Sequence, residues 1–386
     1  MHYSSHAPII TQDESPPALI LLAAGTVEFF WEDDSPFHVV NRPGAIIDAS
    51  LLCPSLDAPP VSARAGAGGA TAWSVAPEQL PACSLALPAV GAIASTAPTN
   101  NGGEPVDTAQ LIELFCETIA QQLTLLRQLH QLRQRLDRSL RHFIEEGEAV
   151  LRSRERHGRG YVELASIPTA PVENFRRLLP PPPRAFADRP AVGGQGQIKP
   201  QGRIYQFADG KTMRWGEDMP AGVYAILTGA VELFFCDAPL DYLDAGDIYG
   251  AALAWAKAYS AEPRGELTRY QRARGETQLQ LIAANWDEFA VLLTDPTLRQ
   301  TVLRRYAERY ENLLYLTAMV RRNIGGVCSR LDDNRRAGAD GGKSCFAFFR
   351  AVEEDAPVEK KRSVHIRQFT AQLRAEADAL IRQPTP

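Results

Sequence analysis

The side chains most often used in catalysis and metal binding are present in this 386-residue sequence, but their spacing matches no familiar site. Structural zinc sites use cysteine or histidine pairs such as Cys-x-x-Cys, and none of the six cysteines has another cysteine at that spacing. The seven histidines show no metal-ligand spacing either. No Gly-x-Ser-x-Gly motif marks a hydrolase nucleophile. We therefore expect a protein that is not an enzyme, with no catalytic residue, metal or cofactor.

One short stretch could in principle bind phosphate. Residues 341–344 read Gly-Gly-Lys-Ser, like the end of a phosphate-binding loop. The first glycine of that motif would fall at residue 337, which is Ala337, and no apolar strand leads into the stretch. We interpret it as part of a polar loop over residues 331–344.

Composition and charge narrow the class of protein. Hydrophobic residues make up 45% of the chain, enough to build a core, and the formal net charge is −5. A nucleic-acid-binding domain is expected to be basic, so nucleic acid is an unlikely partner. The longest apolar run, residues 18–27, is half of the roughly 20 residues that a membrane span needs. Acidic residues precede this run, so we expect no signal peptide, no membrane span and a cytoplasmic protein.

An internal repeat organises the chain. Residues 21–30 read LLAAGTVEFF and residues 225–235 read AILTGAVELFF. Aligning Gly25 with Gly229 also aligns Val, Glu and Phe residues in the two segments. A repeated segment of this kind indicates a structural unit that the chain uses twice.

A second landmark follows each of these segments at nearly the same distance. Residues 43–52 read PGAIIDASLL and residues 245–254 read AGDIYGAALA, which pairs Gly44 with Gly246 and an Ile and a Leu in each. Two landmarks in the same order predict that the whole unit is duplicated.

Each unit has the pattern of short strands. Apolar and polar residues alternate around Glu28, which is typical of a half-buried strand, and the matching residue Glu232 is expected to face solvent in the same way. Gly25 and Gly229 are expected in tight turns between strands. Residues 56–72, rich in Pro, Ala and Gly, are expected to form a loop. The fold class is therefore α+β, with two β-roll (jelly-roll-like) domains.

A helix follows each unit. We expect one helix over residues 107–151, a second over 296–320 and a third over 364–382. The first would be roughly 65 Å long, longer than a β-roll, so its far end needs another partner. The residues that we assign to a helix–helix interface, within the chain or in a homodimer, are Leu126, Leu129, Leu132, Leu136, Leu140 and Phe143.

These elements divide the chain into four parts. The first unit with its long helix occupies residues 1–160, and a linker with four consecutive prolines occupies residues 161–202. The second unit with its helix occupies residues 203–325. Residues 326–386 hold a polar loop and a helix.

The second unit resembles the cyclic-nucleotide-binding β-roll over residues 203–320. The resemblance rests on GVYAILTGAVELFF followed by YLDAGDIYGAALA, whose Gly229, Gly246, Asp247 and Gly250 fit the pattern Ile-Leu-x-Gly-x-Val, then Leu-x-x-Gly-Asp-x-x-Gly-Glu. The first unit resembles the same family over residues 17–143. No helix-turn-helix is recognisable after the second unit.

The resemblance implies a pocket in which the residues of a short helix face a cyclic phosphate, a Glu binds the ribose and an Arg binds the phosphate. In the second unit this pocket would lie at Gly250, Ala251, Ala252 and Leu253. Ala251 stands at the Glu position. The cations that could serve are Arg264, Arg269 and Arg272. In the first unit Asp48 and Ala49 replace the Gly-Glu pair, with Arg64 as the nearby cation.

Three functions follow as expectations. The first is a non-catalytic regulatory or scaffold protein that binds a protein partner or forms a homodimer. The second is a sensor of a cyclic nucleotide or another small ligand. The third is an accessory subunit of a bacterial peptide-export or secretion system, because the first unit is similar to the N-terminal regulatory β-roll of some ABC exporters.

Overall fold

The computed structural model describes residues 1–11, 18–31, 33–52, 61–75, 108–156, 203–235, 238–259, 271–339 and 360–382. The expected linker, residues 161–202, lies outside these residues, as do Arg264 and Arg269. The boundaries assigned to the four parts of the chain therefore stay predictions. Two compact units are distinguished: Met1–Arg127 with Pro182–Ala318 and Arg382–Pro386, and Gln128–Pro181 with Met319–Ile381.

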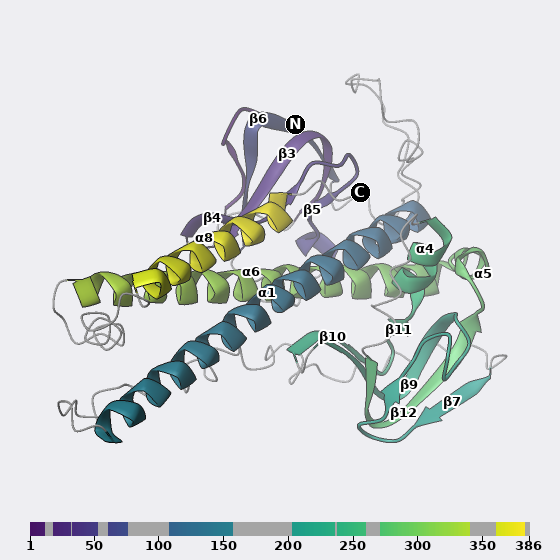
Figure 1. Cartoon of the computed structure of the whole chain (residues 1–386). Helices are drawn as coiled ribbons and strands as arrows, with labels where there is room; N and C mark the ends of the chain where they lie inside the picture. The colour runs from purple at the N-terminus through teal and green to yellow at the C-terminus, as the bar shows by residue number, and fades with distance from the viewer. Residues whose placement is uncertain are drawn as a thin grey trace. The chain divides into compact units, whose positions relative to one another are not determined.

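The first compact unit contains two antiparallel sheets, which we call roll 1 and roll 2. Roll 1 consists of β1 (His2–Tyr3), β2 (Pro8–Ile10), β3 (Leu19–Trp31), β4 (Asp33–Val40), β5 (Ile46–Asp48) and β6 (Ser62–Val75), with the 3-10 helix η1 at Ser50–Leu52. Its strand order is β1-β6-β3-β4, with β2 paired to β6 and β5 paired to β3 (Figure 1).

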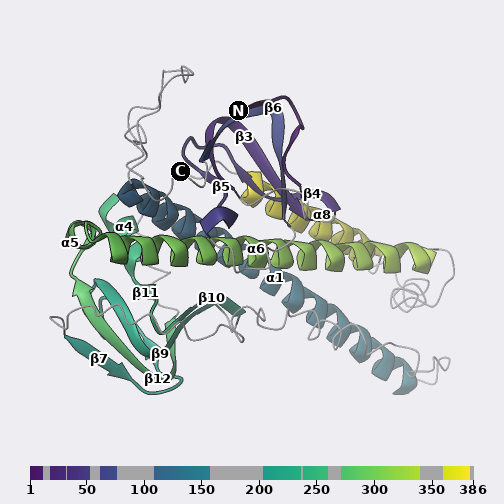
Figure 2. The ribbon, with the colours of Figure 1, turned by 180° about the vertical axis from the view of Figure 1, so that it is seen from behind.

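Roll 2 repeats this topology strand for strand. It consists of β7 (Ile204–Phe207), β8 (Thr212–Met213), β9 (Val223–Phe235), β10 (Ala238–Asp244), β11 (Ile248–Tyr249) and β12 (Gln271–Ala283), with the helix α4 at Ala251–Tyr259. The order is β7-β12-β9-β10, with β8 on β12 and β11 on β9 (Figure 2). Each strand of roll 1 thus has a counterpart in roll 2, whose strand number is six higher. The predicted α+β fold with a duplicated β unit is confirmed at this level.

The glycine landmarks lie elsewhere than expected. Gly25 and Gly229 have positive φ angles, +91° and +69°, but they lie inside the long strands β3 and β9 rather than in hairpin turns. The register of the neighbouring strand shifts beside both glycines, which marks an irregularity of the β-bulge type. The prediction of turns was wrong because a positive φ angle serves a bulge as well as a turn, and the sequence signal is the same.

The expected loop over residues 56–72 is also corrected. Its second half belongs to β6, which pairs with β3 along most of its length. Ala63, Ala65, Ala70 and Ala72 of this strand are buried. Alanine and glycine have low intrinsic preference for strands, but pairing and burial against neighbouring strands override that preference here.

Two long helices follow the rolls. Helix α1 spans Thr108–Arg156, and α6 spans Pro296–Ala339 after the short helix α5, Trp286–Leu292. The residues from 331 to 339, expected as a polar loop, are therefore helical. No proline interrupts these residues, and a polar composition alone does not end a helix.

Within the first compact unit α1 and α6 pack side by side and run in the same direction. The ring of Phe115 contacts the ring of Tyr310 edge-on, with centroids 6.2 Å apart. One heptad further along both helices, the hydroxyl of Thr317 lies 3.3 Å from the amide oxygen of Gln122. Since the two contacts advance equally along both helices, the pairing is parallel, and the heptad spacing is that of a coiled-coil seam.

The second compact unit contains the remaining parts of α1 and α6 together with α8, Lys360–Arg382. Arg135 of α1 binds Glu376, and Arg321 of α6 binds Asp378, so α8 contacts both long helices. Leu373, Ala377 and Ile381 of α8 are buried.

The stripe assigned to a helix–helix interface is buried at four positions. Leu126, Leu129, Leu132 and Leu136 are each at most 5% exposed. Leu140 and Phe143 lie outside the residues whose side chains are described. The first four leucines therefore present no free apolar surface, and the assignment of the stripe to a helix–helix interface stays a prediction. No helix among the described residues is long and apolar enough to cross a membrane.

The bulge glycine of roll 2 gives a test of this fold. A Cβ atom on Gly229 would lie 2.6 Å from the hydroxyl oxygen of Thr277 and 2.8 Å from the carbonyl oxygen of Glu276. Gly210 has a similar φ angle, +73°, but open space around it. We expect Gly210→Ala to lower the free energy of unfolding by about 1 kcal/mol and Gly229→Ala by clearly more, roughly 2–4 kcal/mol. Urea unfolding measures both, and equal losses would contradict the bulge.

Candidate functional site

The short helix α4 begins directly after Gly250, where the family resemblance places a ligand pocket. Gly250 has a φ angle of +90°, and a Cβ atom there would lie 2.4 Å from the carbonyl oxygen of Gly222. That carbonyl also accepts a 2.8 Å hydrogen bond from the indole N–H of Trp215. Only glycine fits this close approach, so the start of α4 is tied to the neighbouring turn.

Three of the four predicted pocket residues, Gly250, Ala252 and Leu253, line a small cavity, and their role in ligand binding stays a prediction. Ala251, Ala252 and Leu253 are each less than 9% exposed. The cavity beside them is lined by Gly250, Ala252 and Leu253 of roll 2 together with Tyr249, Leu233, Arg309 of α6, and Ala120 and Leu123 of α1. Its free space admits about one water molecule. Among the described residues, this free space is smaller than a cyclic nucleotide.

The charged group at this cavity is one that the sequence did not single out. Arg309 is 7% exposed, and its Nε atom donates a hydrogen bond to the Oδ2 atom of Asp241, which is 1% exposed. Arg309 lies on the apolar stripe of α6, between Tyr306 and Tyr310. A guanidinium among apolar seam residues is the signal that could have identified it, because a buried charge requires a partner of opposite charge.

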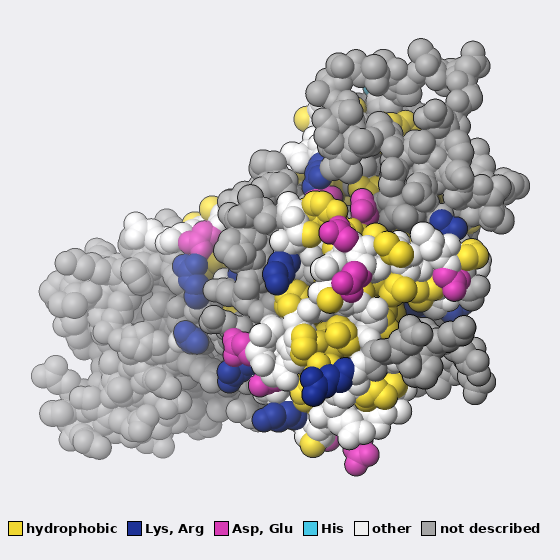
Figure 3. Space-filling model, turned by 90° about the vertical axis from the view of Figure 1, so that its right-hand side faces the viewer, with side chains coloured by type: hydrophobic (Ala, Val, Ile, Leu, Met, Phe, Trp, Pro, Cys, Tyr) yellow, Lys and Arg dark blue, Asp and Glu magenta, His cyan; other side chains and the backbone are white. Residues whose placement is uncertain are grey.

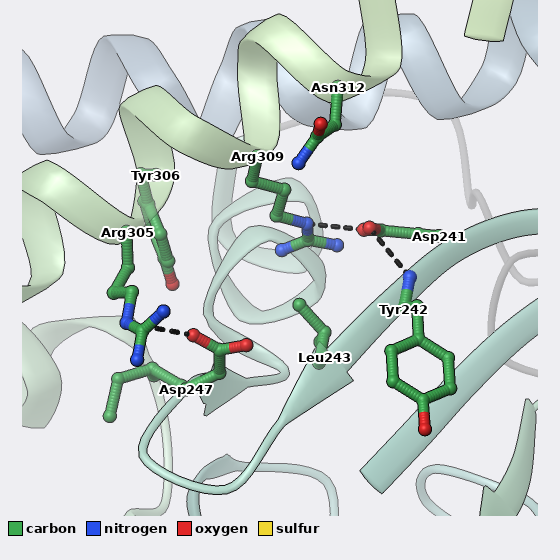
Figure 4. A pocket seen from close by; sticks show the side chains of 9 residues that line it. Asp241, Tyr242, Leu243, Asp247, Arg305, Tyr306, Arg309 and Asn312 are labelled. Atoms are coloured by element: carbon green, nitrogen blue, oxygen red, sulfur yellow. Dashed lines mark hydrogen bonds and ion pairs between the residues drawn. The ribbon is translucent and has the colours of Figure 1, made fainter. Parts of the chain in front are cut away.

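Arg309 also borders a second, polar cavity on its other side (Figure 4). This cavity lies between α6 and the stretch from β10 to β11, and Asp241 of β10, Asp247, Arg305 and Asn312 line it as well. The Nε atom of Arg305 lies 3.3 Å from the Oδ1 atom of Asp247. Two arginines of α6, one helical turn apart, therefore face two aspartates of roll 2. The charges balance, so the cavity has no excess of positive charge for an anionic ligand.

The predicted cation Arg272 is already engaged. On β12 its Nε atom lies 2.9 Å from the Oε2 atom of Glu232, and its guanidinium covers the ring of Phe234 at 4.4 Å. Arg274 binds the same carboxylate at 2.7 Å. Arg272 does not line the cavity beside α4. Its positive charge is therefore used to hold β9 against β12.

Roll 1 contains the same cluster. Arg64 on β6 lies 3.1 Å from Glu28 on β3, and its guanidinium lies over the ring of Phe30 at 5.1 Å. The cluster of acid, aromatic ring and arginine thus recurs at matching strand positions. The expectation that Glu28 and Glu232 simply face solvent was wrong, because the facing strand supplies an arginine to each.

Helix α6 also binds roll 1. The hydroxyl of Tyr310 donates a 2.6 Å hydrogen bond to the carbonyl oxygen of Ile46. The backbone N–H of Ala49 donates a 3.3 Å hydrogen bond to the Oε1 atom of Glu311. Burial and the nearby Asp48 carboxylate raise the pKa of Glu311 to about 8. Burial likewise raises the pKa of Asp48.

A buried polar chain joins roll 1 to both helices. The side-chain amide of Gln122 lies 2.6 Å from the Nε2 atom of His38, and the hydroxyl of Thr317 donates a 2.7 Å hydrogen bond to the carbonyl oxygen of Leu313. The same hydroxyl hydrogen is shared with the Oε1 atom of Gln122, 3.3 Å away, while the amide Nε2 atom of Gln122 faces His38. Burial lowers the pKa of His38 to about 4, which keeps this ring neutral.

The described residues contain no group of three or more His, Cys, Asp or Glu side chains placed to hold a metal ion. The two cysteines whose side chains are described, Cys116 and Cys328, are buried. Burial raises the pKa of Cys116, so its thiol is not activated as a nucleophile.

Comparisons with known proteins give matches among solved structures alone. No protein-family model and no curated protein matches the chain. The cAMP-bound PfPKA-R matches at 12% identity over 86% of this chain and 79% of that chain, with a TM-score of 0.24. The regulatory subunit of a cAMP-independent protein kinase A from Trypanosoma brucei matches at 10% identity over 78% and 77%, with a TM-score of 0.22. The CO-sensing protein from R. rubrum matches at 18% over 36% and 57%, with a TM-score of 0.22. TM-scores of this size carry no argument about ligand or partner.

The contact between Glu311 and roll 1 predicts a pH dependence. The Glu311 carboxyl ionises near pH 4.5 in the unfolded chain and near pH 8 in the folded protein. Between these values the unfolded chain releases a proton that the folded protein keeps, so this group lowers the free energy of unfolding as pH rises from about 4.5 to 8. Glu311→Gln should remove this loss and be more stable than the wild type at pH 8, by on the order of 2 kcal/mol, with little difference at pH 5.

Denaturant unfolding across this pH range measures the effect. Glu217→Gln, on the exposed surface of roll 2, is the matched control and should follow the wild-type profile. A Glu311→Gln profile parallel to that of the wild type would show that Glu311 is ionised in the folded protein.

Proposed function

We propose that this protein is a non-catalytic regulatory or scaffold protein, built on tandem rolls of the cyclic-nucleotide-binding type, that acts by assembly with a protein partner. The observation that supports this proposal is the small size of the cavity beside Gly250–Leu253. Ala120 and Leu123 of α1 and Arg309 of α6 line this cavity, and its free space admits about one water molecule.

The charged residues near this cavity also support a function that does not use a nucleotide ligand. Ala251 stands where the related pattern has an acid for the ribose, so no carboxylate is supplied from that position. Arg272 binds Glu232, and Arg309 binds Asp241. Each of these guanidiniums would have to leave a carboxylate to bind a phosphate, which costs the interaction that it already makes.

The surface favours a protein partner over a nucleic acid. On the face shown in Figure 3, Lys and Arg side chains alternate with Asp and Glu side chains among apolar ones. Together with the net charge of −5, this mixture lacks the single positive field that binds a phosphate backbone. We also propose that the partner is a different protein, because the leucine stripe of α1 is used within the chain at four positions. A cytoplasmic location fits this proposal.

Ligand binding gives the first test. Thermal unfolding is followed with cAMP, cGMP and cyclic di-GMP at millimolar concentration, with AMP as the control for nonspecific effects. We expect no rise in Tm with any of them. A ligand at about a hundred times its Kd adds roughly 2.7 kcal/mol to stability, which a shift of Tm reveals. A saturable rise with a cyclic nucleotide that AMP does not reproduce would replace this proposal with the sensor function.

The oligomeric state gives the second test. We expect sedimentation velocity to give a monomer of 42.4 kDa at micromolar concentration, because the four leucines of the stripe whose side chains are described are buried within the chain. A concentration-independent dimer would contradict the proposal that the partner is a different protein.

A further inference from the structure

We infer that α6 couples the two rolls, so that a change in one roll alters the stability of the other. This inference goes beyond the proposed function and does not depend on the partner. It rests on one stretch of α6, residues 305–311, which lies within the first compact unit and makes polar contacts with both rolls.

One side of this stretch holds roll 2. Arg305 faces Asp247, and Arg309 binds Asp241. Both arginines and both aspartates have side chains at most 9% exposed. Charges buried to this degree are stabilised by their partners, so α6 cannot move away from the β10–β11 segment without leaving charges unpaired.

The next residues of the same stretch hold roll 1. Tyr310 donates its hydrogen bond to the carbonyl oxygen of Ile46, and Glu311 accepts from the backbone N–H of Ala49. Residues 309 and 310 are neighbours, and successive residues of an α-helix point about 100° apart. One helical turn therefore holds both rolls through different sides. A displacement of the α6 side chains by about 1 Å would lengthen the hydrogen bonds to either roll beyond bonding distance.

The two contact regions occupy matching places in the repeat. Ile46–Asp48 is β5 and is followed by η1, while Ile248–Tyr249 is β11 and is followed by α4. Helix α6, which follows roll 2, covers this place in roll 1 through Tyr310 and Glu311. Helix α1, which follows roll 1, covers it in roll 2 through Ala120 and Leu123. Each roll is thus contacted by the helix that follows the other roll as well as by its own helix. Coupling between two such sites is reciprocal.

The test measures hydrogen exchange in the full chain without ligand. Tyr310→Phe removes the hydroxyl that binds Ile46 and keeps the ring. The matched control is Tyr315→Phe, which removes a hydroxyl from the same helix at a residue whose ring contacts Trp31. We expect Tyr310→Phe to raise exchange about fivefold in residues 46–52, the equivalent of a hydrogen bond of about 1 kcal/mol. Exchange in residues 241–249 of roll 2 should also rise, by at least about twofold, and Tyr315→Phe should change neither.

The reverse direction uses roll 2. Asp241→Asn weakens the partner of Arg309 and should raise exchange in residues 46–52 of roll 1. Asp209→Asn is the control, because Asp209 accepts a 2.8 Å hydrogen bond from the backbone N–H of Gly275 within roll 2 and does not contact α6 through it. Should Asp241→Asn fail to fold, the Tyr310→Phe comparison decides alone.

The outcomes separate clearly. A rise in both rolls with Tyr310→Phe and in roll 1 with Asp241→Asn supports the coupling. A rise with Tyr310→Phe that is confined to roll 1, or no rise at all, overturns it. An equal rise in roll 1 with Asp241→Asn and Asp209→Asn also overturns it, because it shows general loosening. Neither result bears on cyclic-nucleotide binding, so this inference and the proposed function fail independently.

Discussion

A guanidinium that leaves water needs a carboxylate, and the pair of Arg309 and Asp241 meets this need at the centre of the first compact unit. The pair fixes the position of α6 along its own axis, and its rotation about that axis, relative to roll 2. Because Tyr310 is the next residue, this rotation also directs its hydroxyl to Ile46 of roll 1. The positions of two apolar cores therefore depend on one ion pair.

The parallel pairing of α1 and α6 follows from the need to remove the apolar side of each helix from water. Each roll ends in a helix with an apolar stripe, and neither stripe can stay in water. Phe115 meets Tyr310 and Gln122 meets Thr317, one heptad apart on both helices. The buried Gln122, with its hydrogen bonds toward His38 and Thr317, gives this seam a polar position that a shifted register would leave unsatisfied. Two copies of a β unit thus form within one chain the kind of helix pair that separate chains often form.

The same packing explains why the cavity at the place of the expected ligand is small. Ala120 and Leu123 of α1 approach the start of α4, where Ala251 and Ala252 offer small side chains and no acid. Small residues permit the close approach of the helix, so the cavity that remains beside them is small.

The sequence by itself determined the duplication. Two glycine landmarks and an alternating Val-Glu-Phe pattern recur because each copy needs the same bulge and the same buried strand face, and these demands are local. The apolar stripes of α1 and α6 could also be predicted from the sequence, because apolar residues repeat every three to four residues within a single helix.

Tertiary structure alone decided which surfaces those elements cover. The sequence could not show that Glu28 and Glu232 meet arginines from a strand more than thirty residues away. It could not show that an alanine-rich segment would be a paired strand. It also gave no sign that Arg309 would be the charged residue at the cavity. Nor could it show that the leucine stripe of α1 packs within its own chain. Contacts between distant segments depend on how complete elements pack, and burial, which sets the cost of each unpaired charge, exists only after that packing has occurred.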